Sequence, residues 1–365
     1  MIRAVLVDDE PPARVRMRQL LEAAGDVTVV GEAGSAMEAR DIIRDTRPDL
    51  LFLDVEMPEV RGTALAASLP EPRPYIVFAT AFESYALDAI ALDATDYLLK
   101  PVSRAKLAAT LDRVRSRLSK QSDLERDVMA ASEVQAQMWP GALPAIAGFD
   151  CAAASLPARG VGGDFYDAFA IDVSTWGLLL GDASGKGMAA GLVASAVQAR
   201  VHSTATLARF APEALMAAVD RDVYATTDGA RYATAIYGSL DAATRVFTLV
   251  NAGHPPVLLL DPTTDAIVRI EATGPALGLI EAGQFTSRTV TIPSGGVLVA
   301  YTDGVSEAQN PHDEEYGDDR LAALIADSRG LSAAALCARI LDTIRHYRGS
   351  RQDQDDVTAL VVRAL

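Results

Sequence analysis

Acidic residues at the ends of strand-like runs are the first feature with chemical meaning near the N-terminus. Asp8 and Asp9 follow the apolar run Ile2–Val7, and Asp54 follows the run Leu50–Leu53. The carboxyl ends of parallel strands meet at one edge of a sheet, where three carboxylates repel one another unless a cation lies among them. Mg²⁺ prefers oxygen ligands and keeps water molecules that a phosphate can replace. The pattern predicts a magnesium site that handles a phosphoryl group.

Two further polar side chains follow later strand-like runs. Thr80 ends the fourth run and offers a hydroxyl group, while Lys100 follows the fifth and offers a mobile cation, with Pro101 directly after it. Each residue alone has an ordinary explanation, because aspartate is common in turns and threonine in strands. The order and spacing of the whole set carry the argument.

This set of residues resembles the receiver domain of two-component response regulators over roughly the first 120 residues. The resemblance implies that a sensor histidine kinase phosphorylates Asp54, whose carboxylate acts as a nucleophile. It implies that Asp8, Asp9 and Asp54 bind Mg²⁺, and that Thr80 and Lys100 contact the phosphoryl oxygens.

Four acidic motifs lie far apart in the C-terminal part of the chain. Each places an aspartate next to a strand-like run, and glycines flank all but the last, so the backbone can approach an ion closely. The acids are not accompanied by cysteine or histidine, which favours Mg²⁺ or Mn²⁺ over zinc. Carboxylates from distant segments suit a two-metal site that activates water for attack on phosphorus. The motifs are Val161–Asp167, Gly181–Gly187, Tyr301–Glu307 and Asp353–Thr358.

In this order the motifs resemble the PPM family of metal-dependent protein phosphatases, in particular its bacterial branch typified by the sporulation stage II protein E and stress-response phosphatases. The resemblance covers about residues 125–365, including Glu133–Gln135 and Asn251–Pro255. It implies a β-sandwich flanked by helices, two Mn²⁺ or Mg²⁺ ions, and hydrolysis of phosphoserine or phosphothreonine on a protein. The implied substrate is a phosphorylated anti-sigma-factor antagonist or a similar partner-switching protein.

The same resemblance implies the metal ligands of this second site. Asp355 is favoured over Asp356, because other branches of the family keep an acid at the first position and an amide at the second; Asp356 remains the alternative. His254 lies between Gly253 and Pro255, so we expect it to serve a turn rather than catalysis. The implied ligands are Asp164, Asp182, Ala183 through its backbone carbonyl, Asp303, and Asp355 or Asp356.

Three other functions are alternatives to a phosphatase. The segment Gly162–Phe165 resembles part of the signature of diguanylate cyclases, but Asp164 runs straight into Phe165 where that signature has another acid, and the other three motifs would be left unexplained. A non-catalytic phosphatase-like binding module is the second alternative, and the acids kept in all four motifs argue against it. A transcription factor would need a basic helix-turn-helix, and none follows the receiver.

The elements that must position these residues change character along the chain. Five short apolar runs with helical patterns between them predict a doubly wound α/β domain with a five-stranded parallel sheet over residues 1–119. Strand-like runs grouped apart from long helical stretches predict an α+β domain over residues 141–365. The runs of the first domain are Ile2–Val7, Val27–Gly31, Leu50–Leu53, Tyr75–Ala79 and Thr95–Leu98.

A purely helical stretch from Ser103 to about Met138 joins the two patterns, with residues 120–140 as a helical linker. Apolar residues in it step by four, three and four, which is typical of a coiled-coil seam. The spacing restarts six residues later, so the register is interrupted. We expect either a rigid connector or a helix that pairs with a second copy in a homodimer. The first stripe is Leu107, Leu111, Val114 and Leu118, and the second is Leu124, Val128 and Ala131.

Composition narrows the range of partners and compartments. The chain has 33 lysines and arginines against 49 acids, a net charge of −16, which argues against binding nucleic acid or an anionic membrane. Cys151 and Cys337 are the two cysteines, too few for a disulfide framework. The first residues show no signal peptide and the apolar runs are too short to span a bilayer, so we expect a cytoplasmic protein.

Overall fold

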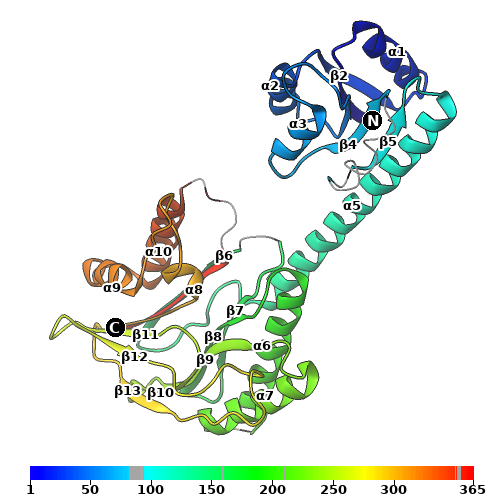
Figure 1. Cartoon of the computed structure of the whole chain (residues 1–365). Helices are drawn as coiled ribbons and strands as arrows, with labels where there is room; N and C mark the ends of the chain where they lie inside the picture. The colour runs from blue at the N-terminus through cyan, green and yellow to red at the C-terminus, as the bar shows by residue number, and fades with distance from the viewer. Residues whose placement is uncertain (82–91, 93, 158–159, 209–210, 350, 352–354) are drawn as a thin grey trace. The chain divides into compact units, whose positions relative to one another are not determined.

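The computed structural model describes residues 1–81, 92, 94–157, 160–208, 211–349, 351 and 355–365 (Figure 1). These residues form two compact units, Met1–Glu125 and Arg126–Leu365, and each unit has its own hydrophobic core. The helix α5 (Arg104–Met138) contributes residues to both units. The boundaries predicted from the sequence, 1–119, 120–140 and 141–365, stay predictions. Among the described residues, no helix is both long enough and apolar enough to cross a bilayer.

The first unit is a five-stranded parallel sheet with the strand order β2-β1-β3-β4-β5. Helices α1 and α5 pack against one face and α2 and α3 against the other, so the central strands are buried on both faces and read as apolar runs. The predicted doubly wound sheet is confirmed. Its elements are β1 (Ile2–Val7), α1 (Pro11–Glu22), β2 (Val27–Ala33), α2 (Ala36–Thr46), β3 (Leu50–Leu53), α3 (Gly62–Ser68), β4 (Tyr75–Thr80) and β5 (Asp96–Leu99).

The N-terminal part of α5 belongs to the core of this first unit. Leu107, Leu111 and Val114 are at most 3 % exposed and pack in the cluster that also contains β1 and β4 residues, and Leu118 packs at its edge. The prediction of a coiled-coil seam along these residues was therefore wrong. A helix that covers a sheet needs the same apolar stripe as a helix that pairs with another helix, so the spacing alone does not separate the two.

The second unit is a sandwich of two five-stranded antiparallel sheets, with orders β13-β10-β9-β8-β7 and β12-β11-β14-β15-β6. Figure 1 shows α6 and α7 over the first sheet and α9 and α10 over the second. The α+β sandwich flanked by helices is thus confirmed. Its strands are β6 (Phe149–Leu156), β7 (Asp164–Ala170), β8 (Thr175–Ala183), β9 (Ala233–Asp241), β10 (Val246–Ala252), β11 (Val257–Asp261), β12 (Ala266–Ile270), β13 (Arg288–Thr291), β14 (Val297–Tyr301) and β15 (Val357–Ala364).

The helices of the second unit follow local signals in the sequence. Pro212 opens α7, where its missing N–H costs no hydrogen bond. Ser332 caps α10 by accepting a hydrogen bond from the backbone N–H of Ala335 at 3.2 Å. The helices are α6 (Met188–Ala208), α7 (Pro212–Thr227), the short α8 (Asp303–Ser306), α9 (Asp318–Asp327) and α10 (Ala333–Arg348).

Candidate functional site

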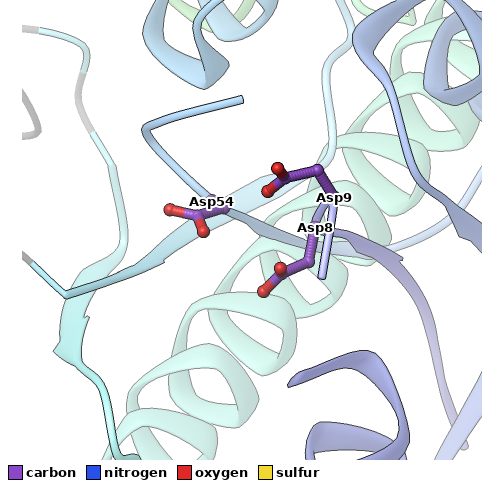
Figure 2. A group of neighbouring side chains, drawn as sticks. All are labelled: Asp8, Asp9 and Asp54. Atoms are coloured by element: carbon purple, nitrogen blue, oxygen red, sulfur yellow. The ribbon is translucent and has the colours of Figure 1, made fainter. Parts of the chain in front are cut away.

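Three carboxylates of the first unit meet where β1 and β3 end. Asp8 directly follows β1 and Asp54 directly follows β3, and the pairing of Val7 with Leu53 brings the two strand ends to the same edge. One carboxylate oxygen from each of Asp8, Asp9 and Asp54 lies within 4.8 Å of the others (Figure 2). Asp8 and Asp54 are 8 % and 7 % exposed. The structure therefore brings the three predicted receiver acids into one site.

Lys100 is the cation of this first site. Its Nζ lies 2.6 Å from Oδ2 of Asp8 and 2.6 Å from Oδ2 of Asp54. Burial lowers the pKa of Lys100, but the two carboxylates outweigh burial and hold that pKa above its ordinary value. Burial raises the pKa of Asp8, and Lys100 offsets this only in part. The site thus holds three carboxylates and one ammonium group, which contacts two of them, and a divalent cation fits the remaining negative charge.

Thr80 ends β4 next to Lys100. The backbone N–H of Lys100 donates to the carbonyl of Thr80 at 2.8 Å, and the Lys100–Pro101 peptide bond is cis. The Thr80 side chain is 1 % exposed, and its hydroxyl finds no hydrogen-bond partner within the described part of the chain. It is available as a donor at this edge of the sheet.

Asp164 and Asp182 form the centre of the second site. They lie directly opposite each other on the antiparallel strands β7 and β8. Asp164 is 2 % exposed, and its Oδ2 accepts hydrogen bonds from the hydroxyls of Thr302 at 2.8 Å and Thr358 at 2.5 Å. Thr358 lies on β15 and Thr302 directly follows β14, two strands of the other sheet, so this carboxylate links the two sheets by hydrogen bonds.

The electrostatics of the second site are those of crowded negative charge. Burial, and then the charges of neighbouring aspartates, raise the pKa of Asp164 to about 8 and that of Asp182 to about 9. Burial and the charge of Asp355 raise the pKa of Asp303 as well. The charge of Asp356 contributes to all three shifts. A divalent cation would relieve this repulsion and allow the carboxylates to ionise.

Two glycines let oxygen atoms converge on this site. A Cβ at Gly163 would lie 2.8 Å from both the carbonyl oxygen of Ala183 and Oδ1 of Asp182. A Cβ at Gly162 would lie 2.6 Å from Oδ2 of Asp356. Since a side chain would overlap these oxygens, glycine is needed at both positions. The cluster offers oxygen donors from both sheets, which fits hard cations such as Mg²⁺ and Mn²⁺.

The two neighbouring acids of the last motif differ in environment. Asp356 is 8 % exposed, and its Oδ2 accepts a hydrogen bond from the backbone N–H of Gly163 at 2.8 Å. The side chain of Asp355 is 50 % exposed, with Oδ2 at 3.5 Å from Nζ of Lys186. Asp353 of the same motif lies outside the described residues. Both Asp355 and Asp356 remain candidate ligands.

Arg348 is a buried cation behind the second site. Its Nη2 donates to the carbonyl of Gly304 at 2.8 Å, directly after Asp303. Burial lowers the pKa of Arg348, and the nearby aspartates oppose that shift. Arg348 lies outside the motifs, so the motifs gave no signal for it. Thr302 and Thr358 stand inside the motifs, but a hydroxyl beside an aspartate does not by itself indicate a role in the site.

The carboxylates of the second site are more dispersed than those of the first. Among the described residues, the set whose ligand oxygens all lie within 4.8 Å is Asp8, Asp9 and Asp54, and no trio of the second-site acids joins it. His254 is 4 % exposed, and its Nδ1 lies 2.8 Å from the hydroxyl of Thr234. Burial lowers the pKa of His254 to about 3, so it stays neutral. The turn role expected for His254 stays a prediction.

Comparisons with known proteins find one family within each unit. The response regulator receiver domain family matches residues 4–112, and the stage II sporulation protein E (SpoIIE) family matches residues 172–365. The transcriptional regulatory protein BtsR of Escherichia coli (strain K12) is 48 % identical over 122 residues, which are 33 % of this chain and 51 % of BtsR. The chain spans about half the length of the curated relatives it matches.

Solved structures resemble the second unit. The RsbU and RsbW domains of Rv1364c from Mycobacterium tuberculosis match with a TM-score of 0.55 and 28 % identity, over 62 % of this chain and 63 % of that one. The SiaA-PP2C domain of Pseudomonas aeruginosa matches with a TM-score of 0.59 and 20 % identity, over 67 % and 98 % of the two chains, and shows the fold alone.

Fold and comparisons together define a receiver domain followed by a phosphatase domain of the PP2C (PPM) type. The chain belongs to the stage II sporulation protein E (SpoIIE) family. Phosphatases of this class depend on Mg²⁺ or Mn²⁺, and both acidic sites have the oxygen donors that these ions prefer.

Proposed function

We propose that this protein is a response regulator in which phosphorylation of Asp54 by a histidine kinase controls a metal-dependent serine/threonine protein phosphatase. The observation that carries the proposal is the pairing of two acid sites in one chain. One site is a strand-edge cluster with a lysine between its carboxylates, and the other is an inter-sheet cluster of buried aspartates.

In the receiver, Asp54 is the proposed nucleophile. Its carboxylate oxygen would form a bond to the phosphorus of a phosphohistidine as the bond from phosphorus to the histidine nitrogen breaks. Lys100 already donates a hydrogen bond to the Asp54 carboxylate, and after phosphorylation it would donate to the phosphoryl oxygens instead. The hydroxyl of Thr80, which has no hydrogen-bond partner among the residues that the structure describes, is the proposed second donor to those oxygens. Asp8 and Asp9, with Asp54, would hold Mg²⁺.

In the phosphatase unit, the proposed ligands of two Mn²⁺ or Mg²⁺ ions come from both sheets. When bound, the ions would supply a water molecule activated for in-line attack on phosphorus. Thr302 and Thr358 hold Oδ2 of Asp164 in place, so that the acid keeps one orientation. The proposed ligands are Asp164, Asp182, the carbonyl of Ala183, Asp303, and Asp355 or Asp356.

The proposed substrate is a phosphoserine or phosphothreonine protein, and the favoured candidate is an anti-sigma-factor antagonist or a similar partner-switching protein. Likeness to the RsbU domain of Rv1364c supports this choice. The net charge of −16 fits a protein partner rather than nucleic acid.

The test combines both sites of the purified full chain. Acetyl phosphate should label a single acid-stable, base-labile position that is lost in Asp54→Ala, because Asp54 is the proposed acceptor. Phosphate release from candidate phosphoproteins should require Mn²⁺ or Mg²⁺ and should change on labelling in the wild type but not in Asp54→Ala. Wild-type labelling of Asp54→Ala would refute the acceptor, and a chain that binds Mn²⁺ but never releases phosphate would be a non-catalytic module.

A further inference from the structure

Gln135, near the C-terminal end of α5, uses both ends of its amide on one glycine. Its Nε2 donates to the carbonyl of Gly162 at 2.8 Å, and its Oε1 accepts from the backbone N–H of Gly162 at 3.0 Å. Gln135 is 5 % exposed, so water does not compete well for these groups. The side chain thus pairs with Gly162 as a neighbouring β-strand would.

The same face of α5 contacts the preceding residues of that loop. The hydroxyl of Ser132 donates to the carbonyl of Gly160 at 2.8 Å. A Cβ at Gly160 would lie 2.9 Å from Cγ1 of Val128. Val128, Ser132 and Gln135 are spaced by four and three residues, which places them on one helical face. The loop is therefore held along a row of three contacts, of which Gln135 is the last and the most buried.

The other side of the loop faces the acid cluster. The backbone N–H of Gly163 donates to Oδ2 of Asp356 at 2.8 Å, and its carbonyl accepts from the N–H of Ala183 at 3.1 Å. Asp164 is the next residue. The pair Gly162-Gly163 therefore lies between Gln135 on one side and proposed metal ligands on the other.

The pair Gly162-Gly163 does not supply the rigidity that a residue next to Asp164 needs. Two adjacent glycines have the largest conformational freedom of any residue pair, so their geometry must be imposed by neighbours. The helix α6 encloses Gln135 from another side. A Cβ at Gly191 of α6 would lie 2.2 Å from Cγ1 of Val161 and 3.0 Å from Nε2 of Gln135. The amide of Gln135 is thus closely enclosed and has little room to turn away from Gly162.

We propose that Gln135 is a positioning residue for the metal site of the phosphatase unit. By holding both backbone polar groups of Gly162, it fixes Gly163 and Asp164 relative to Asp356 and the carbonyl of Ala183, and so sets the affinity for divalent cations. The inference rests on the proposed function in one respect, that these acids bind metal ions.

The decisive variant is Gln135→Met, which keeps the length of the side chain and removes both hydrogen bonds. Partners that orient metal ligands typically contribute about 10- to 100-fold to metal affinity, so we expect the Mn²⁺ dissociation constant to rise about tenfold or more. Free Mn²⁺ is measured by electron paramagnetic resonance during titration of the full chain. All variants carry the same receiver, so differences between their isotherms arise in the phosphatase unit.

The chain offers a matched control two residues further along the same helix. Gln137 is exposed, and Gln137→Met should reproduce the wild-type isotherm. Hydrolysis of p-nitrophenyl phosphate by Gln135→Met should be weak at limiting Mn²⁺ and recover as Mn²⁺ is raised. A purely structural defect would not be repaired by added cation in this way. Gln135→Asn, which keeps the amide but is one methylene too short, provides a second variant if Gln135→Met does not fold.

A folded Gln135→Met or Gln135→Asn variant with the wild-type Mn²⁺ isotherm would overturn the inference, and so would a wild-type phosphatase unit that binds no Mn²⁺. Wild-type protein that binds Mn²⁺ but hydrolyses no phosphoester would contradict the proposed function and leave the role of Gln135 standing. A Gln135→Met isotherm shifted as expected, together with a Gln137→Met isotherm that is not, supports it.

Discussion

Asp164 and Asp182 show how strongly burial and crowding oppose the ionisation of carboxyl groups inside a protein. Each has a pKa far above that of a free aspartate, because burial and neighbouring charges oppose ionisation. A stable fold does not require such an arrangement, since a buried carboxylate that lacks a compensating cation is destabilising. Its presence where two sheets meet therefore points to cation binding.

Removal of one ligand charge should abolish turnover while the fold survives. We expect Asp182→Asn or Asp303→Asn to lower phosphate release to background, because an amide is a poorer ligand for a hard cation and no longer offsets its charge. Activity of the wild type should vanish in EDTA and return with Mn²⁺ or Mg²⁺. Circular dichroism checks that each variant is folded. Full turnover by either variant, or by the wild type in EDTA, is the result that would rule out the two-metal site.

His254 should make the folded protein sensitive to acid. Its folded-state pKa is about 3, against an ordinary value of 6.5, so the unfolded chain takes up a proton that the folded chain refuses between these values. The free energy of unfolding should therefore fall as the pH drops below 6.5, by at most about 1.4 kcal/mol per pH unit from this group. His254→Asn keeps a polar side chain beside Thr234 but removes the titratable ring, so it should flatten the curve. Urea denaturation at several pH values measures it, and parallel curves for the two proteins would refute the assignment.

At the scale of elements, the strands of the parallel sheet were the easiest to predict. Strands buried on both faces are continuous apolar runs, and β1 and β3 have the bounds predicted for them. The strand β6 had no such signal, because its centre, Cys151–Ala154, consists of small residues. It pairs with β15, about two hundred positions away, where Ala154 faces Ala359. A contact over that distance leaves no local pattern in the sequence.

The candidate sites were predictable to the extent that their chemistry lies in residue types. Aspartates beside strand-like runs identified both acid clusters before any geometry was known. Gln135 and Arg348 were not given roles, because glutamine and arginine in a helix are ordinary surface residues until packing buries them. The wrong prediction of a coiled-coil seam at Leu107 has the same origin, since an apolar stripe on a helix does not indicate whether it packs on a sheet or on another helix.

For the whole molecule, α5 is the element that contributes residues to both units. Its first part is buried in the receiver core, and Val128, Ser132 and Gln135 contact the loop that leads to Asp164. Residues 119–127 are exposed throughout, and Leu124 is 63 % exposed. No side chain of this stretch is buried in the core of either unit, so a change in its length should alter the coupling between the units and spare the fold of each.

Insertions within the exposed stretch test whether α5 transmits the signal. One residue inserted after Asp123 would rotate the downstream helix by about 100°, since an α-helix has 3.6 residues per turn, whereas seven residues add nearly two full turns. We expect the first insertion to abolish the effect of Asp54 phosphorylation on the phosphatase rate, and the second to retain much of it. Basal rate and Asp54 labelling should persist in both. An unchanged response in the one-residue variant would show that α5 is only a spacer.

The hydroxyls that donate hydrogen bonds to Asp164 belong to Thr358 on β15 and to Thr302 directly after β14, on the side of the opposite sheet. This arrangement couples metal binding to the packing of the two sheets. Asp164 and Asp182 stand on one sheet, while Asp303 and Asp356 flank strands of the other. Cations bound by acids from both sides would cross-link the two sheets of the sandwich. By thermodynamic linkage, a cation that binds only the assembled sheets stabilises their assembly, and a shift of one sheet over the other lowers the affinity for the cation. Metal affinity and the stability of the packing between the two sheets of the phosphatase unit should therefore rise and fall together.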